Sequence, residues 1–259
     1  MNSWAVCSPC TPRCVTHSRP SVTTMETARR WTAAAGILAG ALPAAAHGEL
    51  GPSARRLLSG LGVEVAANTE RLSVPDEARG TLIVANHLSW LDIIAALAVE
   101  PTGFLAKAEL RRWPVVGRVA ARAGTRFVDR GTLRGLPAVV AGLSATLAAG
   151  RSVLVFPEGT TWCGRCGSGG PFRRAAFQAA IDAGAPIRPV TFAYHQAGRP
   201  STVASFVGDD TLFDSLRRIT RARDLRIDLT AHPPFAPDGD RRELAARAQA
   251  VITGEPVHV

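Results

Sequence analysis

A histidine and an aspartate, with four residues between them, lie in segment 84–95, which reads Val-Ala-Asn-His-Leu-Ser-Trp-Leu-Asp-Ile-Ile-Ala. Residues five apart on a continuous helix point in different directions, so His87 and Asp92 can meet only if the helix begins between them. Ser89 is a favoured N-cap residue, and Asp92 stands three residues on, where a capping box has its acid. The Asp92 carboxylate then accepts the Nδ1 proton of His87 and leaves Nε2 as a general base. The alternative is that Asp92 only caps a helix and His87 is a turn residue.

The loop 156–161, Phe-Pro-Glu-Gly-Thr-Thr, is a second candidate site. It follows an apolar strand pattern, as the histidine does, and open α/β sheets bind ligands beyond the carboxyl ends of their strands. We expect both segments to face one crevice. Gly159 permits close backbone approach, Thr160 and Thr161 can hydrogen-bond glycerol or phosphate oxygens, and Glu158 can orient a substrate hydroxyl. The alternative is a simple turn.

The charge of the chain indicates an anionic partner. Thirty basic against 21 acidic residues give a formal net charge of +9. Arg126 and Arg130 stand at the two ends of a short strand pattern and are candidates to hold a phosphate bidentately. Aromatic residues are only 6% of the chain and no groove-reading motif is present, which argues against a nucleic-acid partner. An anionic lipid surface suits the same charge, since each nearby basic residue contributes roughly 1 kcal/mol there.

Elements that can position these residues alternate along the chain from residue 63. Short apolar runs alternate with helical patterns such as 90–99 and 136–149, which is typical of an α/β fold. We expect a single domain, residues 63–259, with a mixed, largely parallel central sheet flanked by helices. Prolines within 186–190 predict an edge strand or a strand start. The expected strands are 63–66, 81–85, 104–107, 125–128, 152–156, 187–194, 202–207 and 225–231.

The N-terminal region has a different character. Residues 1–24 show no periodic apolar face, so we expect a disordered leader, with Met25 as an alternative start. Residues 25–62 are expected to form a pair of membrane-associated helices. The apolar run that ends near Ala46 has about 15 residues, fewer than the roughly 20 that span a bilayer. A basic start and a small-residue end also fit a signal peptide, but we favour a helix that lies in the membrane interface.

The five cysteines, at positions 7, 10, 14, 163 and 166, include two Cys-x-x-Cys pairs. Such pairs suggest zinc, but these two are far apart in the sequence and the first lies in the leader, so we expect no metal site. A redox pair at Cys163 and Cys166 lacks the helix that opens a thioredoxin-like motif. The odd number of cysteines favours a reducing compartment.

Four ordered segments resemble the lysophospholipid acyltransferase family, which includes the 1-acylglycerol-3-phosphate acyltransferases. Segment 86–92 is similar to the family's HX4D block, and 124–130, 156–161 and 187–190 are similar to its three later blocks. The resemblance covers about residues 54–231 and includes the stretch 107–117. Four blocks in order are far more specific than any one of them.

The resemblance implies an α/β fold with an N-terminal membrane-associated helical pair, and direct acyl transfer from a thioester to a lysolipid hydroxyl. Direct transfer of this kind requires no bound cofactor and no metal; the expected donor is acyl-CoA or acyl carrier protein. Carried over by position, it makes His87 the general base with Asp92 as its partner, places Glu158, Gly159 and Thr160 at the acceptor, and makes Arg126, Arg130 and Lys107 phosphate or donor contacts. Thr161 stands where the family usually has an arginine.

We therefore expect an acyltransferase at the cytoplasmic face of the cell membrane, peripheral or monotopic. Its first expected acceptor is 1-acyl-sn-glycerol-3-phosphate, which would give phosphatidic acid. Because of Thr161, the alternatives are that Arg126, Arg130 or Arg165 replaces the missing cation, or that the acceptor is another lysolipid such as a lyso-ornithine lipid. The chain has no Gly-x-Ser-x-Gly elbow, so a serine acyl-enzyme lacks sequence support. The rival classes are a thioesterase and a non-catalytic membrane-binding protein.

Overall fold

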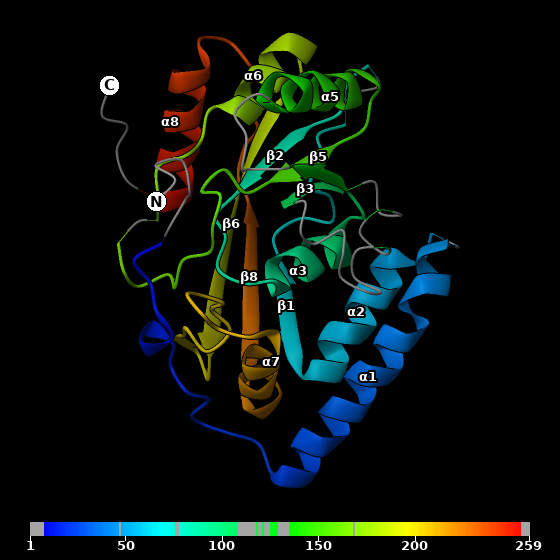
Figure 1. The fold of residues 1–259 in the computed structure, drawn as a ribbon, viewed down its shortest axis with the longest axis vertical. Coiled ribbons are helices and arrows are strands. Elements are labelled where there is room, and N and C mark those ends of the chain that lie inside the picture. Colours follow the sequence, from blue (N-terminus) through cyan, green and yellow to red (C-terminus); the bar gives the residue numbers. More distant parts are fainter. Residues whose placement is uncertain are drawn as a thin grey trace.

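The computed structural model describes residues 8–46, 48–75, 78–107, 118, 121, 125–128, 135–167 and 169–254 (Figure 1). Their strands form one sheet of order β1-β8-β6-β2-β5-β3-β4, with the short β7 paired to β6. The strands are β1 (Val63–Ala67), β2 (Leu82–Ala85), β3 (Gly103–Lys107), β4 (Arg126–Val128), β5 (Val153–Val155), β6 (Ile187–Gln196), β7 (Arg199–Pro200) and β8 (Leu225–Ala231). The helices are η1 (Pro12–Cys14), α1 (Thr24–Ala46), α2 (Leu50–Leu61), α3 (Leu91–Val99), α5 (Leu136–Ala148), α6 (Ala175–Ala183), α7 (Leu212–Arg221) and α8 (Arg241–Thr253).

The sheet is mixed and largely parallel, as expected from the sequence. Strands β2, β3, β4 and β5 pair in parallel, β2 and β6 are parallel, and β8 runs antiparallel to β6. The prolines of 186–190 mark the start of a strand, which is one of the two expected positions. The strand is not at an edge, because β6 lies between β2 and β8. Pro189 stands opposite Val84 of β2, and its carbonyl accepts a hydrogen bond from the His232 N–H at 2.9 Å.

Strand β2 separates two hydrophobic cores because its side chains alternate between the faces of the sheet. Leu82 and Val84 pack with α5, α6 and α8, whereas Ile83 and Ala85 pack with α2 and α3. All four are fully buried, which explains why the strand is an uninterrupted apolar run. Strand β2 ends at Ala85, so residues 86–92 begin directly at its carboxyl end.

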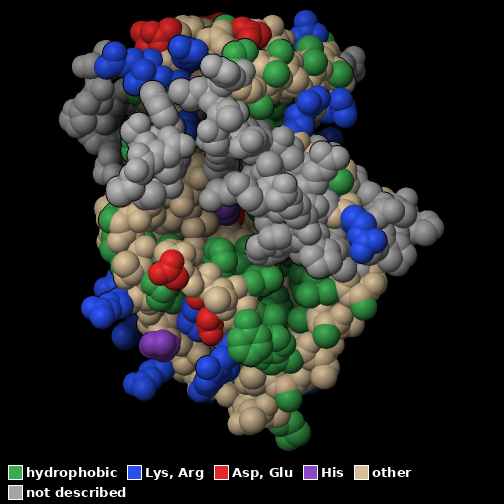
Figure 2. All heavy atoms as spheres, in the orientation of Figure 1, with side chains coloured by type: hydrophobic (Ala, Val, Ile, Leu, Met, Phe, Trp, Pro, Cys, Tyr) green, Lys and Arg blue, Asp and Glu red, His purple; other side chains and the backbone are tan. Residues whose placement is uncertain are grey.

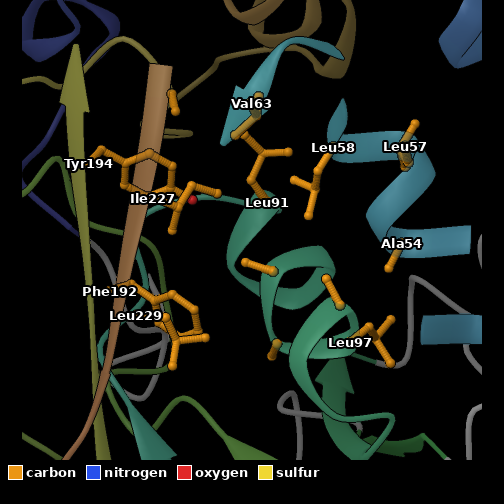
Figure 3. Close-up of a cluster of buried hydrophobic side chains, with 14 of the residues drawn as sticks. Ala54, Leu57, Leu58, Val63, Leu91, Leu97, Phe192, Tyr194, Ile227 and Leu229 are labelled. Atoms are coloured by element: carbon orange, nitrogen blue, oxygen red, sulfur yellow. The ribbon is translucent and has the colours of Figure 1, made fainter. Parts of the chain in front are cut away.

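Helix α3 lies between the sheet and α2. Figure 3 shows Leu91 and Leu97 of α3 among side chains of α2 and of strands β6 and β8. Both leucines belong to the same buried cluster as Leu58 and Leu61 of α2. Helix α2 is therefore part of the packing that holds α3 in place.

The N-terminal helices form part of this same body. Ala34 of α1 is buried, and the Arg30 guanidinium of α1 donates to the Ala222 carbonyl at 2.7 Å. Within the described part of the chain, none of the helices combines the length and apolar character needed to cross a bilayer.

Two expectations about irregular segments are wrong. Residues 8–23 of the expected disordered leader pack on the body, where Val22 N–H donates to the Arg221 carbonyl at 2.9 Å and Gln196 Nε2 to the Pro20 carbonyl at 2.7 Å. Segment 202–207 is not a strand. Its polar groups bond to other loops instead of a neighbouring strand, as the Phe206 N–H does with the Leu88 carbonyl at 2.9 Å.

We predict that Leu58→Ala lowers the free energy of unfolding by about 2–5 kcal/mol, because it opens a cavity between α2 and α3. Leu58 is 2% exposed, whereas Leu38 on α1 is 40% exposed and Leu38→Ala is the matched control. Urea unfolding measures both. Equal stability of the two variants would show that α2 is not part of the core.

Candidate active site

His87 and Asp92 meet across the first turn of α3. The His87 Nδ1 lies 2.9 Å from the Asp92 Oδ2, and the side chains are 18% and 0% exposed. Helix α3 begins at Leu91, one residue later than a Ser89 cap predicts, yet Ser89 Oγ still accepts from the Leu91 N–H at 3.3 Å. The two residues are brought together because the histidine precedes the helix and the aspartate lies on it.

The buried Asp92 carboxylate accepts four hydrogen bonds from described residues. Besides the imidazole, Oδ2 accepts from the backbone N–H groups of Leu88 at 2.7 Å and Ser89 at 2.9 Å. Oδ1 accepts from the Tyr194 hydroxyl of β6 at 2.5 Å. Burial, followed by the charge of Asp92, raises the pKa of Tyr194 well above its ordinary value, so this phenol stays a proton donor. These donors orient the carboxylate toward His87 Nδ1 and leave Nε2 of the ring as its proton acceptor.

Glu158, three residues after the end of β5, binds the backbone of His87. Its Oε2 accepts a hydrogen bond from the His87 backbone N–H at 2.7 Å, and the residue is only 3% exposed. Burial raises the pKa of Glu158 to about 8; the His87 N–H opposes this shift and the charge of Asp92 adds to it. Gly169 leaves room for Glu158 Oε1, since a Cβ there would collide with it. At neutral pH the Glu158 carboxyl is mostly protonated.

The loop 156–161 packs directly against the histidine. The Phe156 ring stacks on the His87 ring, with centroids 4.0 Å apart and an angle of 15° between the ring planes. The backbone N–H of Trp162 donates to the His87 carbonyl at 2.8 Å. Gly159 has a φ of +76°, a conformation that favours glycine, in a turn where its N–H donates to the Phe156 carbonyl at 3.1 Å. His87 and the loop 156–161 therefore lie together, as expected from the sequence.

The threonines of this loop have different surroundings. Thr160 is half-buried next to Gly159. Thr161, which stands where the resemblance implies an arginine, donates its hydroxyl proton to the Phe206 carbonyl. That hydrogen bond fastens the loop to segment 202–207.

The basic candidates are not gathered at the histidine. Arg126 Nε donates to Thr146 Oγ1 of α5 at 2.8 Å, on the opposite face of the sheet from α3. The structure therefore does not bring Arg126 to His87, because the α5 face binds its guanidinium. Lys107 is the last residue of β3, but its side chain is not among the described parts of the structure. Arg130 lies outside the described residues.

Sequence reasoning missed two residues that shape the site. Tyr194 is the only tyrosine of the chain, and the alternation of β6 places it with Val190 and Phe192 among the buried residues. A buried tyrosine needs a hydrogen-bond partner, which was the available signal. Asn86 fixes the turn before His87: its side chain donates to the Phe192 carbonyl at 3.0 Å and accepts from the Phe192 N–H at 2.8 Å.

The structure brings together the two groups of cysteines, whose distance in the sequence argued against a shared site. Cys10 and Cys14 of the leader lie with Cys163 and Cys166, just beyond the loop 156–161. Sequence distance concealed this cluster, because the leader folds back across the molecule.

The chain is similar in sequence and fold to known acyltransferases. Residues 65–193 match the family model described as Acyltransferase. The chain is 37% identical over 198 residues to a lyso-ornithine lipid O-acyltransferase of Pseudomonas aeruginosa, covering 76% of this chain and 74% of the relative. It is 36% identical over 180 residues to a 1-acyl-sn-glycerol-3-phosphate acyltransferase of Neisseria meningitidis, covering 69% of this chain and 70% of that relative. The crystal structure of the 1-acyl-sn-glycerophosphate acyltransferase PlsC from Thermotoga maritima has the same fold, with a TM-score of 0.63, 22% identity, and coverage of 89% of this chain and 92% of that one.

We predict that Glu158→Gln changes the pH dependence of stability. In the wild type the folded carboxyl keeps its proton up to a pKa of about 8, whereas the unfolded one loses it near its ordinary value of 4.5. The free energy of unfolding therefore falls as pH rises between these values, by at most about 1.4 kcal/mol per pH unit. The amide of the variant does not titrate and removes this contribution, so Glu158→Gln should gain stability relative to wild type from pH 5 to pH 8.

Urea unfolding at pH 5, 6.5 and 8 measures the effect, with the exposed Glu64→Gln as the control. Parallel curves for wild type and Glu158→Gln would contradict a buried, protonated Glu158.

Proposed function

The chain belongs to the acyltransferase family, and we propose that it transfers a fatty acyl group from a thioester donor to the free hydroxyl of a lysophospholipid. The first acceptor that we propose is 1-acyl-sn-glycerol-3-phosphate, which would become phosphatidic acid. The observation that carries this proposal is the His87–Asp92 contact of 2.9 Å, because it leaves the second ring nitrogen as a base.

In the proposed reaction, His87 Nε2 takes the proton of the acceptor hydroxyl while that oxygen attacks the thioester carbonyl carbon. The tetrahedral intermediate collapses with cleavage of the carbon–sulfur bond. The leaving thiolate then takes the proton back from the imidazolium, so the enzyme returns to its starting state. Proton transfer of this kind typically contributes 10²- to 10⁴-fold to the rate.

The buried carboxylate supports both stages of this reaction. Before attack, Asp92 keeps the proton on Nδ1 and so keeps Nε2 free. After attack, its negative charge stabilises the imidazolium across 2.9 Å. The 18% exposure of the His87 side chain is consistent with access of a substrate hydroxyl to Nε2.

We assign the acceptor contacts to Glu158, Gly159 and Thr160 and the catalytic domain to residues 63–259. Two observations support the first assignment: Glu158 accepts the His87 N–H, and Gly159 lies in the turn that follows Phe156, whose ring stacks on His87. Glu158 would act mainly by holding the histidine backbone, since its Oε2 already accepts the His87 N–H. The donor is acyl-CoA or acyl carrier protein.

A lyso-ornithine lipid is the second candidate acceptor, and Thr161 favours it. This residue offers no positive charge to a phosphate and its hydroxyl is bonded to the Phe206 carbonyl. Arg126, which would be a replacement cation, is bonded to Thr146 instead. The similarity to the Pseudomonas aeruginosa relative, which is named for this activity, agrees with the same alternative.

We propose that α1 and α7 bind the cytoplasmic surface of the cell membrane. Among the described side chains of these helices, four large hydrophobic ones are exposed: Met25 (82%), Leu38 (40%), Leu212 (39%) and Phe213 (64%). Phe213 also packs on Trp31, with ring centroids 5.5 Å apart. Figure 2 shows hydrophobic side chains gathered on this face, in the region where Figure 1 places α7 and the adjoining part of α1. Interfacial helices of this kind bury such side chains among lipid head groups.

We predict that His87→Gln lowers acyl transfer by 10²- to 10⁴-fold without loss of cooperative unfolding, because it removes the base. His195→Gln is the matched control, since His195 Nδ1 also lies 2.8 Å from a carboxylate, that of Asp228. The assay supplies a labelled acyl thioester with 1-acyl-sn-glycerol-3-phosphate or lyso-ornithine lipid. Label in a diacylated lipid supports acyl transfer and identifies the acceptor. Label only in free fatty acid would indicate a thioesterase, and full activity of His87→Gln would refute the proposed base.

We predict that the double variant Met25→Glu, Phe213→Glu binds phosphatidylglycerol-containing vesicles at least about tenfold more weakly, because burying one such side chain contributes about 1.5–3 kcal/mol. Val251→Glu is the control, since Val251 is 37% exposed on α8, away from these helices. Vesicle flotation measures binding. Unchanged flotation of the double variant would exclude this surface as the membrane contact.

A further inference from the structure

Four cysteine side chains converge between the N-terminal leader and the loop that follows Glu158. The Sγ atoms of Cys10, Cys14, Cys163 and Cys166 all lie within 4.8 Å of one another. Three residues lie between Cys10 and Cys14, and two between Cys163 and Cys166. Both spacings are typical of cysteines that bind one zinc ion. Each pair therefore places two sulfur atoms within reach of one ion.

The distances favour a metal over disulfides. The Cys14 and Cys166 Sγ atoms are 3.6 Å apart, whereas bonded sulfurs are about 2.05 Å apart. Tetrahedral Zn²⁺ with bonds of about 2.3 Å to sulfur separates its ligands by about 3.8 Å. Two separate disulfides would not require all four atoms to gather. We propose that these four thiolates bind one Zn²⁺ ion in a closed, structural site with four sulfur ligands.

The backbone around Cys163 supports metal binding. Gly164 and Gly167 have φ values of +77° and +81°, which favour glycine and turn the chain tightly around the pair. The Arg165 N–H points at the Cys163 Sγ, 3.4 Å away, and such hydrogen bonds stabilise a metal-bound thiolate. The backbone of residues 163–167 therefore favours a thiolate at Cys163 that can bind a cation.

The surroundings fit a structural site better than a catalytic one. Cys10 and Cys163 are buried at 2% exposure with Val15 and Val207, and Trp162 packs against this cluster. Four sulfur ligands complete a tetrahedron and leave no position for water or substrate. Binding replaces four S–H protons with four Zn–S bonds, and no electron is transferred.

The metal would fasten the leader to the active-site loop. On the leader side, Thr202 Oγ1 donates to the Cys14 carbonyl at 3.0 Å. On the loop side, Ser205 Oγ donates to the Cys163 carbonyl at 3.1 Å, and the adjacent Trp162 N–H donates to the His87 carbonyl at 2.8 Å. Since a metal that binds only the folded state stabilises that state, zinc should hold the loop against the histidine.

The test is the metal content of the full-length protein, purified with a thiol reductant and measured by elemental analysis. We expect about one zinc per chain for wild type, and loss of most of it in Cys14→Ser and in Cys166→Ser. Cys7→Ser is the matched control and should keep its zinc, because the other four cysteines complete the site. Circular dichroism shows whether each variant is folded. Replacement of zinc by Co²⁺ gives a second readout, since tetrahedral thiolate ligation produces intense charge-transfer absorption.

Alkylation of the wild type separates the alternatives. In the folded protein, four cysteines that react only after a chelator is added, together with one zinc per chain, support the site. In denatured protein prepared without a reductant, cysteines that react only after reduction, with no metal bound, would show disulfides and overturn the proposal. Free thiols that take up neither Zn²⁺ nor Co²⁺ from solution would overturn it as well. None of these readouts depends on acyltransferase activity.

Discussion

The buried carboxylate of Asp92 is the interaction on which the arrangement of the site depends. A buried charge is tolerated only where hydrogen bonds replace its lost hydration, and here two backbone amides, a phenol and an imidazole do so. The amides belong to the turn after β2 and the phenol to β6, so one group joins a turn, a helix and a neighbouring strand. The same bonds that make the charge acceptable also orient the histidine.

The parts of this arrangement that are local in sequence were predictable. The HX4D spacing and the β-to-α transition predicted that His87 and Asp92 meet, because a helix that begins between them brings them to one side. Apolar runs and helical periodicity predicted the main strands and α3. Length and composition agreed with an α/β fold, which the PlsC structure shares.

The parts that depend on tertiary contacts were not predictable. Nothing near Tyr194 in the sequence shows that its hydroxyl faces Asp92, 102 residues away. Segment 202–207 has the composition of a strand, but its hydrogen bonds connect loops to the leader. Arg126 stands in a block that resembles a phosphate-binding segment, yet the Thr146 hydroxyl on α5 accepts its hydrogen bond. The cysteines of the leader look isolated until the chain folds back over residues 196–223.

The central claim is that Asp92 holds the proton on Nδ1 of His87, so that Nε2 is a free base. Nitrogen-15 NMR of the protein with labelled histidine tests this directly, with the His87 signals assigned from their absence in His87→Gln. At a pH where the ring is neutral, the account predicts a protonated Nδ1 and an unprotonated Nε2. A neutral His87 ring that carries its proton on Nε2 would contradict it.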